Sequence, residues 1–363
     1  MKKIQVLIVD DSALMRKKIK EMLDSAFGIE VVGTARNGED GVQKAIELKP
    51  DVVTLDVNMP VMDGLTALKI ITQKNICPVI MLSSLTQEGA DTTFEALEEG
   101  AFDFVAKPSG TVSRDIEIVK RELITKVKAA AGMGLTKLTR KITAPRPAPE
   151  FIKAKKEPEP VHHRHDEAVA ADFKAVCIGI STGGPKTIFD VLPALPSDLK
   201  AAVFLVQHMP PGFTEAFARR LNESCGIYVK EAAAGDIVTP GVCYLGKAGN
   251  HMTLYKKMNG EITLRLGKTP DHAFMPSVDV MMESVSGVFG EKTLGVIMTG
   301  MGNDGAASML RIKKAGGYTI AESEETSVVF GMPREAIENG SVDIVLPSYK
   351  IAAEIVRKID RGW

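Results

Sequence analysis

The stretch "AVCIGISTGGP", residues 175–185, is an apolar run that ends in a turn of serine, threonine and glycine. A continuous apolar run of this length is typical of a strand that is buried on both faces of a parallel sheet. Two interpretations of the turn are open. Its glycines could hold a phosphate close to the backbone, or the turn could present Ser181 as a nucleophile.

Similar strands surround this stretch in the second half of the chain. "AVFLVQH" (202–208) precedes an amphipathic helical segment, and "TLGVIMTGM" (293–301) precedes another. Residues 237–267 break the alternation with turns and period-two patterns, which indicates an antiparallel hairpin beside the main sheet. The second half is therefore expected to be a doubly wound, mostly parallel α/β domain with an antiparallel hairpin.

The first half shows a simpler alternation of strands and helices. Its strand-like runs stand at residues 5–11, 30–36, 51–57, 78–84 and 103–109, with helical patterns between them. This regular alternation predicts a flavodoxin-like (βα)5 domain, in which right-handed crossovers connect parallel strands.

Residues 131–172 separate the two halves and are rich in proline and charge. A length of 363 residues also suits two domains. We therefore expect a domain at 1–130, a flexible linker at 131–172 and a second domain at 173–363. The sequence "HHRH" (162–165) in the linker is interpreted as a solvated basic cluster and not as a metal site.

Composition excludes several classes of protein. The chain has 45 basic and 46 acidic residues, so it lacks the overall positive charge of many nucleic-acid-binding proteins. Four scattered cysteines without a CxxC pair predict reduced, mostly buried thiols. The first apolar run ends at Val9 before two aspartates, too short for a signal segment or a membrane span. A cytoplasmic protein is expected.

Acidic side chains follow two strands of the first half, with Asp10 and Asp11 after one and Asp56 at the end of another. Because the carboxyl ends of parallel strands meet at one edge of the sheet, we expect these carboxylates to lie close together. Mg²⁺ would relieve their repulsion, and one aspartate could accept a phosphoryl group. Lys107 and Ser83 stand at further strand ends. Helix capping is the alternative for Asp11 or Ser12 alone.

The first half resembles the receiver domain of bacterial response regulators through "VDDS", "LDVNMPVMDG", "MLSS" and "FVAKP". The resemblance implies that Asp56 accepts a phosphoryl group from a histidine kinase. It also implies further roles: Asp10, Asp11, Asp56 and the Asn58 carbonyl around Mg²⁺, Ser83 and Lys107 as groups that sense the phosphoryl, and Phe104 at the position of an aromatic switch. Many receivers carry tyrosine there, so switching at Phe104 would rest on packing alone.

Three polar residues of the second half also fall at predicted strand ends, namely Ser181, His208 and Asp304. Together they have the composition of a nucleophile, a general base and the group that orients the base. Each alone has a simpler interpretation. Ser181 could cap a helix, His208 could be a turn histidine, and Asp304 or its neighbour Asn303 could be a helix N-cap.

Motif spacing bears on the opening question. "GISTGGPK" matches neither the dinucleotide fingerprint nor the P-loop, because the second glycine and the Lys-Ser/Thr step are misplaced. It does match G-x-S-x-G, but that elbow belongs to enzymes in which the acid precedes the histidine. Here His208 precedes Asp304.

The second half resembles the catalytic domain of the chemotaxis receptor methylesterase family, CheB, through "GISTGGP", "VQHMPPGFT", "PSVDVMMESV" and "LGVIMTGMGNDGA". The resemblance implies hydrolysis of receptor γ-glutamyl methyl esters, and deamidation of receptor glutamines, by Ser181, His208 and Asp304. It places the oxyanion donors near Thr182 and Met301. The family usually has alanine at the position of Ile180, a change expected to be tolerated.

The resemblance also implies partners and regulation. A histidine kinase would be the phosphodonor, methyl-accepting chemotaxis receptors the substrate, and phosphorylation would relieve a block by the receiver. We expect a monomer that binds no DNA, does not insert into membranes, and needs Mg²⁺ only for phosphorylation. "LGKAGNH" departs from the family's "APGxxH", which leaves His251 without an assigned role. A transcriptional regulator and a nucleotide-binding regulator are the alternatives.

Overall fold

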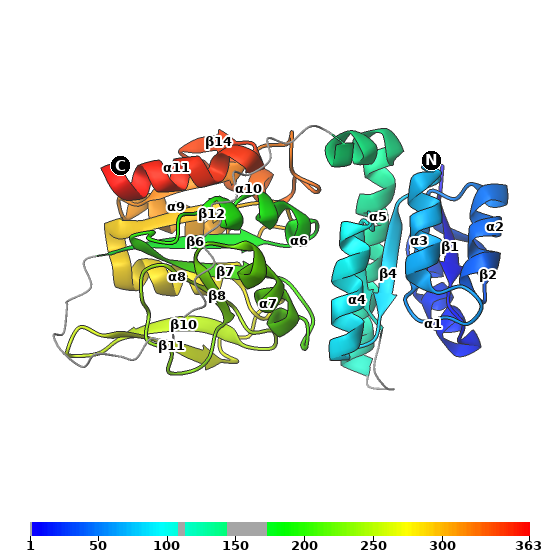
Figure 1. Ribbon diagram of the computed structural model, residues 1–363, viewed down its shortest axis with the longest axis horizontal. Coiled ribbons are helices and arrows are strands. Elements are labelled where there is room, and N and C mark those ends of the chain that lie inside the picture. Colours follow the sequence, from blue (N-terminus) through cyan, green and yellow to red (C-terminus); the bar gives the residue numbers. More distant parts are fainter. Residues whose placement is uncertain (1, 108–112, 144–172) are drawn as a thin grey trace. The chain divides into compact units, whose positions relative to one another are not determined.

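The computed structural model describes residues 2–107, 113–143 and 173–363 (Figure 1). The chain forms two units, residues 1–145 and 146–363, each with its own sheet and its own helices.

The first unit alternates strands and helices from its first strand to its last helix. Its elements are β1 (Ile4–Val9), α1 (Ala13–Asp24), β2 (Ile29–Ala35), α2 (Gly38–Leu48), β3 (Val52–Asp56), α3 (Gly64–Gln73), β4 (Val79–Ser83), α4 (Gln87–Glu98), β5 (Asp103–Ala106) and α5 (Ser113–Thr143). The strands are all parallel and lie in the order β2-β1-β3-β4-β5. This is the predicted flavodoxin-like (βα)5 fold.

Burial and capping explain why these elements form. Strands β3, β4 and β5 are buried along their whole length, as their apolar runs require. Four helices begin at a residue whose side chain accepts a backbone N–H of the first turn: Ser12, Asn37, Asp63 and Thr86. The capping interpretation of Ser12 is therefore confirmed, and Asp11 remains free of that role.

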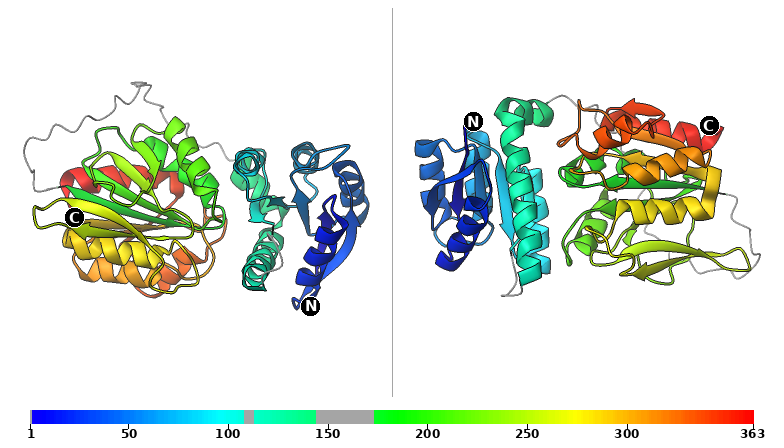
Figure 2. Two further views of the ribbon diagram at one scale, coloured as in Figure 1. Left: turned by 90° about the horizontal axis from the view of Figure 1, so that it is seen from below. Right: turned by 180° about the vertical axis from the view of Figure 1, so that it is seen from behind.

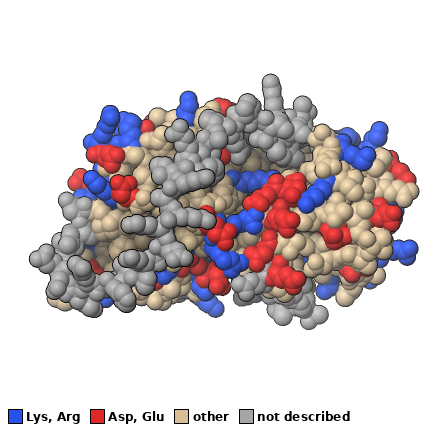
Figure 3. Space-filling model, viewed as in Figure 1, with Lys and Arg blue, Asp and Glu red and all other residues tan. Residues whose placement is uncertain are grey.

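Two features of this unit lie outside the sequence-based expectation. Helix α5 continues to Thr143, well into the segment predicted as linker. The exposed residues of α4 are mostly acidic and include Glu88, Asp91, Glu95 and Glu98, and Figure 3 shows acidic side chains gathered over this helix. The "HHRH" cluster at 162–165 lies outside the described residues.

The second unit is built around a larger sheet. Its strands are β6 (Lys174–Ile180), β7 (Ala201–Gln207), β8 (Tyr228–Glu231), β9 (Val242–Leu245), β10 (His251–Lys256), β11 (Ile262–Gly267), β12 (Thr293–Ile297), β13 (Tyr318–Glu322) and β14 (Ile344–Leu346). Its helices are α6 (Gly184–Thr187), α7 (Thr214–Ser224), α8 (Val278–Phe289), α9 (Ala306–Lys314), α10 (Met332–Glu338) and α11 (Ser348–Arg361), with short 3₁₀ turns at 188–190, 192–194 and 290–292.

The main sheet of this unit has the order β14-β13-β12-β6-β7-β9-β8, and its described strand pairs are parallel. Helices α8 and α9 pack on one face of the sheet, and α11 lies on the other (Figure 2). The core under α8 is formed by large apolar side chains such as Phe204, Met281, Met282 and Met309. The predicted doubly wound α/β architecture is confirmed.

The region 237–267 differs in one respect from the prediction. Strands β10 and β11 form the expected antiparallel hairpin, which packs against α8. Strand β9, however, joins the main sheet in parallel, between β7 and β8. Its short apolar run, "VCYL", does not distinguish a hairpin strand from a buried parallel strand.

Candidate functional sites

The three strands that carry Ser181, His208 and Asp304 are neighbours in the main sheet. Ser181 follows β6 directly, His208 follows β7, and Asp304 lies in the loop after β12. Because β12, β6 and β7 are adjacent and parallel, their carboxyl ends bring the three loops together. Sequence reasoning placed these residues correctly at strand ends.

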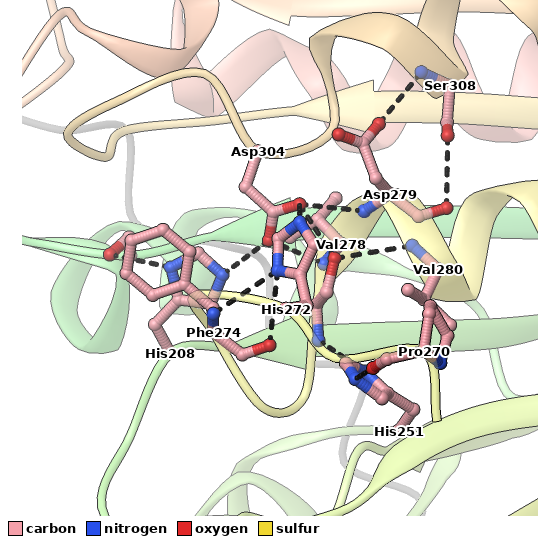
Figure 4. A network of polar contacts seen from close by, with 12 residues as sticks. His208, His251, Pro270, His272, Phe274, Val278, Asp279, Val280, Asp304 and Ser308 are labelled. Atoms are coloured by element: carbon pink, nitrogen blue, oxygen red, sulfur yellow. Dashed lines mark hydrogen bonds and ion pairs between the residues drawn. The ribbon is translucent and has the colours of Figure 1, made fainter. Parts of the chain in front are cut away.

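His208 lies between the other two residues and contacts both. Its Nδ1 is 3.1 Å from the Ser181 hydroxyl, and its Nε2 is 2.8 Å from Asp304 Oδ2 (Figure 4). The side-chain amide of Gln207 donates to the carbonyls of Ser181 and His208, which fixes the ends of the two strands. In the neutral ring, the proton therefore sits on Nε2 toward Asp304, and Nδ1 accepts from the serine hydroxyl.

The Asp304 side chain is buried against the N-terminus of helix α8, from which it is distant in sequence. Besides His208, its carboxylate accepts hydrogen bonds from the Ser277 hydroxyl at 2.8 Å, from Val278 N–H at 2.7 Å and from Asp279 N–H at 3.0 Å. Burial alone would raise the pKa of this carboxyl, but the bond and charge of His208 and these N–H groups lower it to about 2. The carboxylate is thus held ionised beside the imidazole.

The simpler interpretations of these residues fail. The N-cap of α9 is Gly305, so Asp304 does not cap that helix, and Asn303 is exposed. The N-cap of α6 is Gly183, which lacks a side-chain bond, so Ser181 does not cap α6. The helix after Ser181 is only four residues long, because 3₁₀ turns follow Thr187.

The glycines of the turn are required by close packing. Gly183 has a left-handed φ of +79°, and a Cβ built there would lie 2.3 Å from Val328 Cβ. A Cβ on Gly184 would lie 2.3 Å from Gln207 Oε1. Side chains of the protein therefore occupy the space beside both glycines, which argues against a phosphate-binding role for this turn.

The predicted oxyanion donors lie close to the serine. A Cβ on Gly300 would lie 2.9 Å from Ser181 Cβ, so the backbone leading to Met301 passes close to the nucleophile. Within residues 173–363, the N–H groups of Thr182 and Met301 make no hydrogen bond to the chain. Both are thus available for a negatively charged oxygen.

Sequence reasoning did not identify the groups that hold Asp304 or cover His208. Ser277 and Val278 begin α8, and Phe274 stacks on the His208 ring. The quoted stretch "PSVDVMMESV" contains the first two, and its serine before an apolar helix is an N-cap signal. No pattern in the sequence marks Phe274.

A second cluster lies at the carboxyl ends of β1 and β3 in the first unit. Asp10, Asp11 and Asp56 offer carboxylate oxygens that lie within 4.8 Å of one another. The Lys107 ammonium lies 2.8 Å from Asp10 Oδ2 and 2.7 Å from Asp56 Oδ2. Arg16 donates to the carbonyls of Asp10 and Asp11.

Burial and pairing act against each other at this cluster. Burial raises the pKa of Asp56 and outweighs the lowering by its bond and charge interaction with Lys107. Burial would lower the pKa of Lys107, but the hydrogen bonds that its ammonium donates to Asp10 and Asp56 raise it above its usual value. The lysine thus stays charged and partly neutralises the carboxylates.

The cluster fits a magnesium ion. Its donors are carboxylate oxygens, which Mg²⁺ prefers, and Asp11 is exposed, which leaves room for water and a phosphoryl group. The cation would be held by Asp10, Asp11 and Asp56. Asn58 is exposed, and its backbone N–H interacts with Asp56, while a role for its carbonyl stays a prediction.

Ser83 and Phe104 both point into the first unit. The Ser83 hydroxyl is buried and donates to the Gly89 carbonyl of α4 at 3.0 Å. Phe104 is buried, with its ring edge-on to Phe94. Their predicted roles in sensing a phosphoryl group remain predictions.

Comparison with known proteins relates both units to described families. The family model described as CheB methylesterase matches residues 176–355, and the response regulator receiver domain model matches residues 6–115. A protein-glutamate methylesterase/protein-glutamine glutaminase of Syntrophomonas wolfei is 56% identical over 99% of this chain and 100% of its own length.

This chain belongs to the CheB methylesterase family. A relative from Pyrococcus horikoshii with the same name is 46% identical over 99% of this chain and 94% of its own length. The solved catalytic domain of Thermotoga maritima CheB methylesterase is 41% identical, with a TM-score of 0.50, and covers 51% of this chain and 98% of that domain. The chain is accordingly an ester hydrolase joined to a response regulator receiver.

Two further findings concern the helices and the cysteines. Among the described residues, no helix combines the length and the apolar character that a membrane crossing requires. The four cysteines are free, and burial raises the thiol pKa of Cys77 and of Cys225 to about 12. These two thiols are therefore poor nucleophiles compared with a serine activated by histidine.

Proposed function

We propose that this protein removes methyl groups from γ-glutamyl methyl esters of chemotaxis receptors, with Ser181 as nucleophile, His208 as base and Asp304 as the group that orients the base. The position of His208, 3.1 Å from the serine hydroxyl and 2.8 Å from the Asp304 carboxylate, carries this proposal. The names of the relatives supply the class of substrate.

The first half of the reaction forms an acyl-enzyme. His208 Nδ1 takes the Ser181 proton as the serine oxygen attacks the ester carbonyl carbon. Asp304 keeps the other ring proton on Nε2 and stabilises the imidazolium. The N–H groups of Thr182 and Met301 donate to the oxyanion, and methanol leaves with the proton from Nδ1.

The second half releases the receptor glutamate. Water gives a proton to His208 Nδ1 and attacks the acyl carbon, and the serine oxygen regains the proton as the glutamate departs. Deamidation of a receptor glutamine follows the same steps with ammonia as the leaving group. The esterase chemistry uses no cofactor in this scheme.

Phosphorylation of Asp56 is the proposed control. A histidine kinase of the chemotaxis pathway would supply the phosphoryl group, and bound Mg²⁺ would neutralise charge on the phosphoryl oxygens. Lys107 would pair with the phosphoryl group once phosphorus is bonded to one Asp56 carboxylate oxygen and the kinase histidine has left, and Ser83 and Phe104 would respond to it. Because the substrate glutamates belong to cytoplasmic receptor helices, we place the protein in the cytoplasm.

The test is methanol release from methylated receptor membranes. Ser181→Ala is expected to lose detectable methanol release while Asp56 still becomes phosphorylated. A Ser181→Ala variant that releases methanol at the wild-type rate would contradict the assigned nucleophile. Calorimetric titration with common nucleotides checks the alternative of a nucleotide-binding regulator, for which no binding is expected.

A further inference from the structure

Residues 268–277 form a connecting segment between β11 and α8, and this segment crosses the active site. In its middle, the Phe274 ring stacks on the His208 ring, with ring centroids 4.2 Å apart and planes inclined by 6° (Figure 4). The His208 side chain is only 8% exposed, whereas Phe274 is 38% exposed. Phe274 therefore covers one face of the base and separates it from solvent.

The two ends of the segment are tied to one buried histidine. His251, the first residue of β10, donates from Nε2 to the Pro270 carbonyl at 3.0 Å and accepts at Nδ1 from Ser277 N–H at 3.2 Å. Its ring is fully buried. A neutral ring with its proton on Nε2 satisfies both bonds, and a protonated ring would lose the second.

The surroundings of His251 favour that neutral form. Burial lowers its pKa most and the neighbouring His272 lowers it further, while the Pro270 carbonyl and Asp304 act in the opposite direction. These two residues and the Pro270 carbonyl are the groups that influence its ionisation. The clamp is therefore expected to stay intact at neutral pH.

A third histidine shapes the middle of the segment. His272 Nδ1 is 3.2 Å from Phe274 N–H, and its Nε2 lies 3.8 Å from Asp304 Oδ1. With Nδ1 as acceptor, the ring carries its proton on Nε2 and points it toward the Asp304 carboxylate. The position of Phe274 is thus defined from within the segment as well as from its ends.

We propose that Phe274 is a positioning residue that acts through His208, and that His251 clamps the segment that carries it. The inference rests on the function proposed above. Stacking keeps the imidazole in the plane that joins Ser181 to Asp304. The π-face of Phe274 also stabilises the positive charge that the imidazole acquires when it takes the serine proton, because a cation is attracted to an aromatic face.

This role predicts a particular kinetic change. Phe274→Leu keeps an apolar cover but removes the π-face, and it is expected to lower kcat by about tenfold with KM within about twofold. Phe274→Tyr keeps the ring and is the matched control, with kcat within about twofold of wild type. The assay is methanol release from methylated receptor membranes, with thermal unfolding of each variant as the check on folding.

A spectroscopic measurement tests the stacking without using activity. The carbon-bound ring protons of His208 are expected to resonate upfield in wild type and in Phe274→Tyr, because they lie over an aromatic ring. The upfield shift should be lost in Phe274→Leu. It should also shrink in His251→Asn, which removes the donor to Pro270, and in His251→Gln, which removes the acceptor for Ser277 N–H.

Different outcomes would contradict the role of Phe274, the role of His251 and the proposed esterase function. Equal kcat for Phe274→Leu and Phe274→Tyr, or a change confined to KM, would overturn the positioning role. Unchanged His208 shifts in folded His251 variants would overturn the clamp. Wild-type protein that releases no methanol would instead contradict the proposed function, while the ring-proton shifts would still support or contradict the stacking by themselves.

Discussion

His208 and Asp304 are joined by a 2.8 Å hydrogen bond from Nε2, so the nitrogen nearer the backbone, Nδ1, is the one that faces Ser181. The Asp304 carboxylate is itself held by the first residues of α8, which are distant from it in sequence. The orientation of the base therefore depends on a helix N-terminus as well as on a carboxylate.

Asp304→Asn is expected to lower kcat by about 10³- to 10⁴-fold, because an amide cannot stabilise the imidazolium as a carboxylate does. The measurement is methanol release from methylated receptor membranes. Asn303→Ala, at the exposed neighbouring position, is the matched control and should keep wild-type activity. A large loss of activity in Asn303→Ala, with little loss in Asp304→Asn, would show that Asp304 is not the residue that orients the base.

The acid stability of the second unit should depend on Asp304. Its pKa is lowered from 3.8 to about 2, so folding favours the ionised form. The resulting stabilisation is fully present above pH 3.8 and is lost as the pH falls through about 2. It amounts to about 2 kcal/mol.

This pH dependence is measured by urea unfolding of wild type and of Asp304→Asn. The difference between their free energies of unfolding is expected to shrink as the solution is acidified through this range, because the variant has no carboxyl to protonate. A difference that stays constant with pH would show that the carboxylate is not specifically stabilised.

Lys107→Met should destabilise the first unit in the absence of Mg²⁺. The variant leaves Asp10 and Asp56 buried without the neighbouring ammonium, at a loss of about 3 kcal/mol in the free energy of unfolding. Added Mg²⁺ is expected to restore part of the loss, because the cation neutralises the same carboxylates.

Urea unfolding with and without Mg²⁺ tests this expectation. The control is Lys44→Met, which removes the more exposed pair with Asp40 and should change the free energy by less than about 1 kcal/mol. A Lys107→Met variant as stable as Lys44→Met, or one indifferent to Mg²⁺, would contradict the account of the carboxylate cluster.

The sequence predicts those parts of the fold and sites that depend on strands buried on both faces. Ser181, His208 and Asp304 could be anticipated because each follows a long apolar run, and parallel strands bring such ends together. The position of β9 in the main sheet could not be anticipated, because its four apolar residues fit the parallel main sheet and the antiparallel hairpin equally well.

Contacts between loops were also beyond prediction from the sequence. Phe274 reaches His208 because His251, in β10, bonds to Pro270 and Ser277 near the two ends of the segment 268–277. Such positions depend on the path of an irregular segment, which carries no periodic pattern. His251 had no assigned role from its motif, and its two ring bonds now give it a structural one.

The central claim is that this chain is a methylesterase whose activity rises when Asp56 is phosphorylated. The most direct test is the rate of methanol release from methylated receptor membranes, with and without a phosphodonor and Mg²⁺, for wild type and Asp56→Ala. The account predicts that the phosphodonor raises the wild-type rate and leaves the Asp56→Ala rate unchanged. Equal stimulation of both proteins, or no methanol release from either, would contradict it.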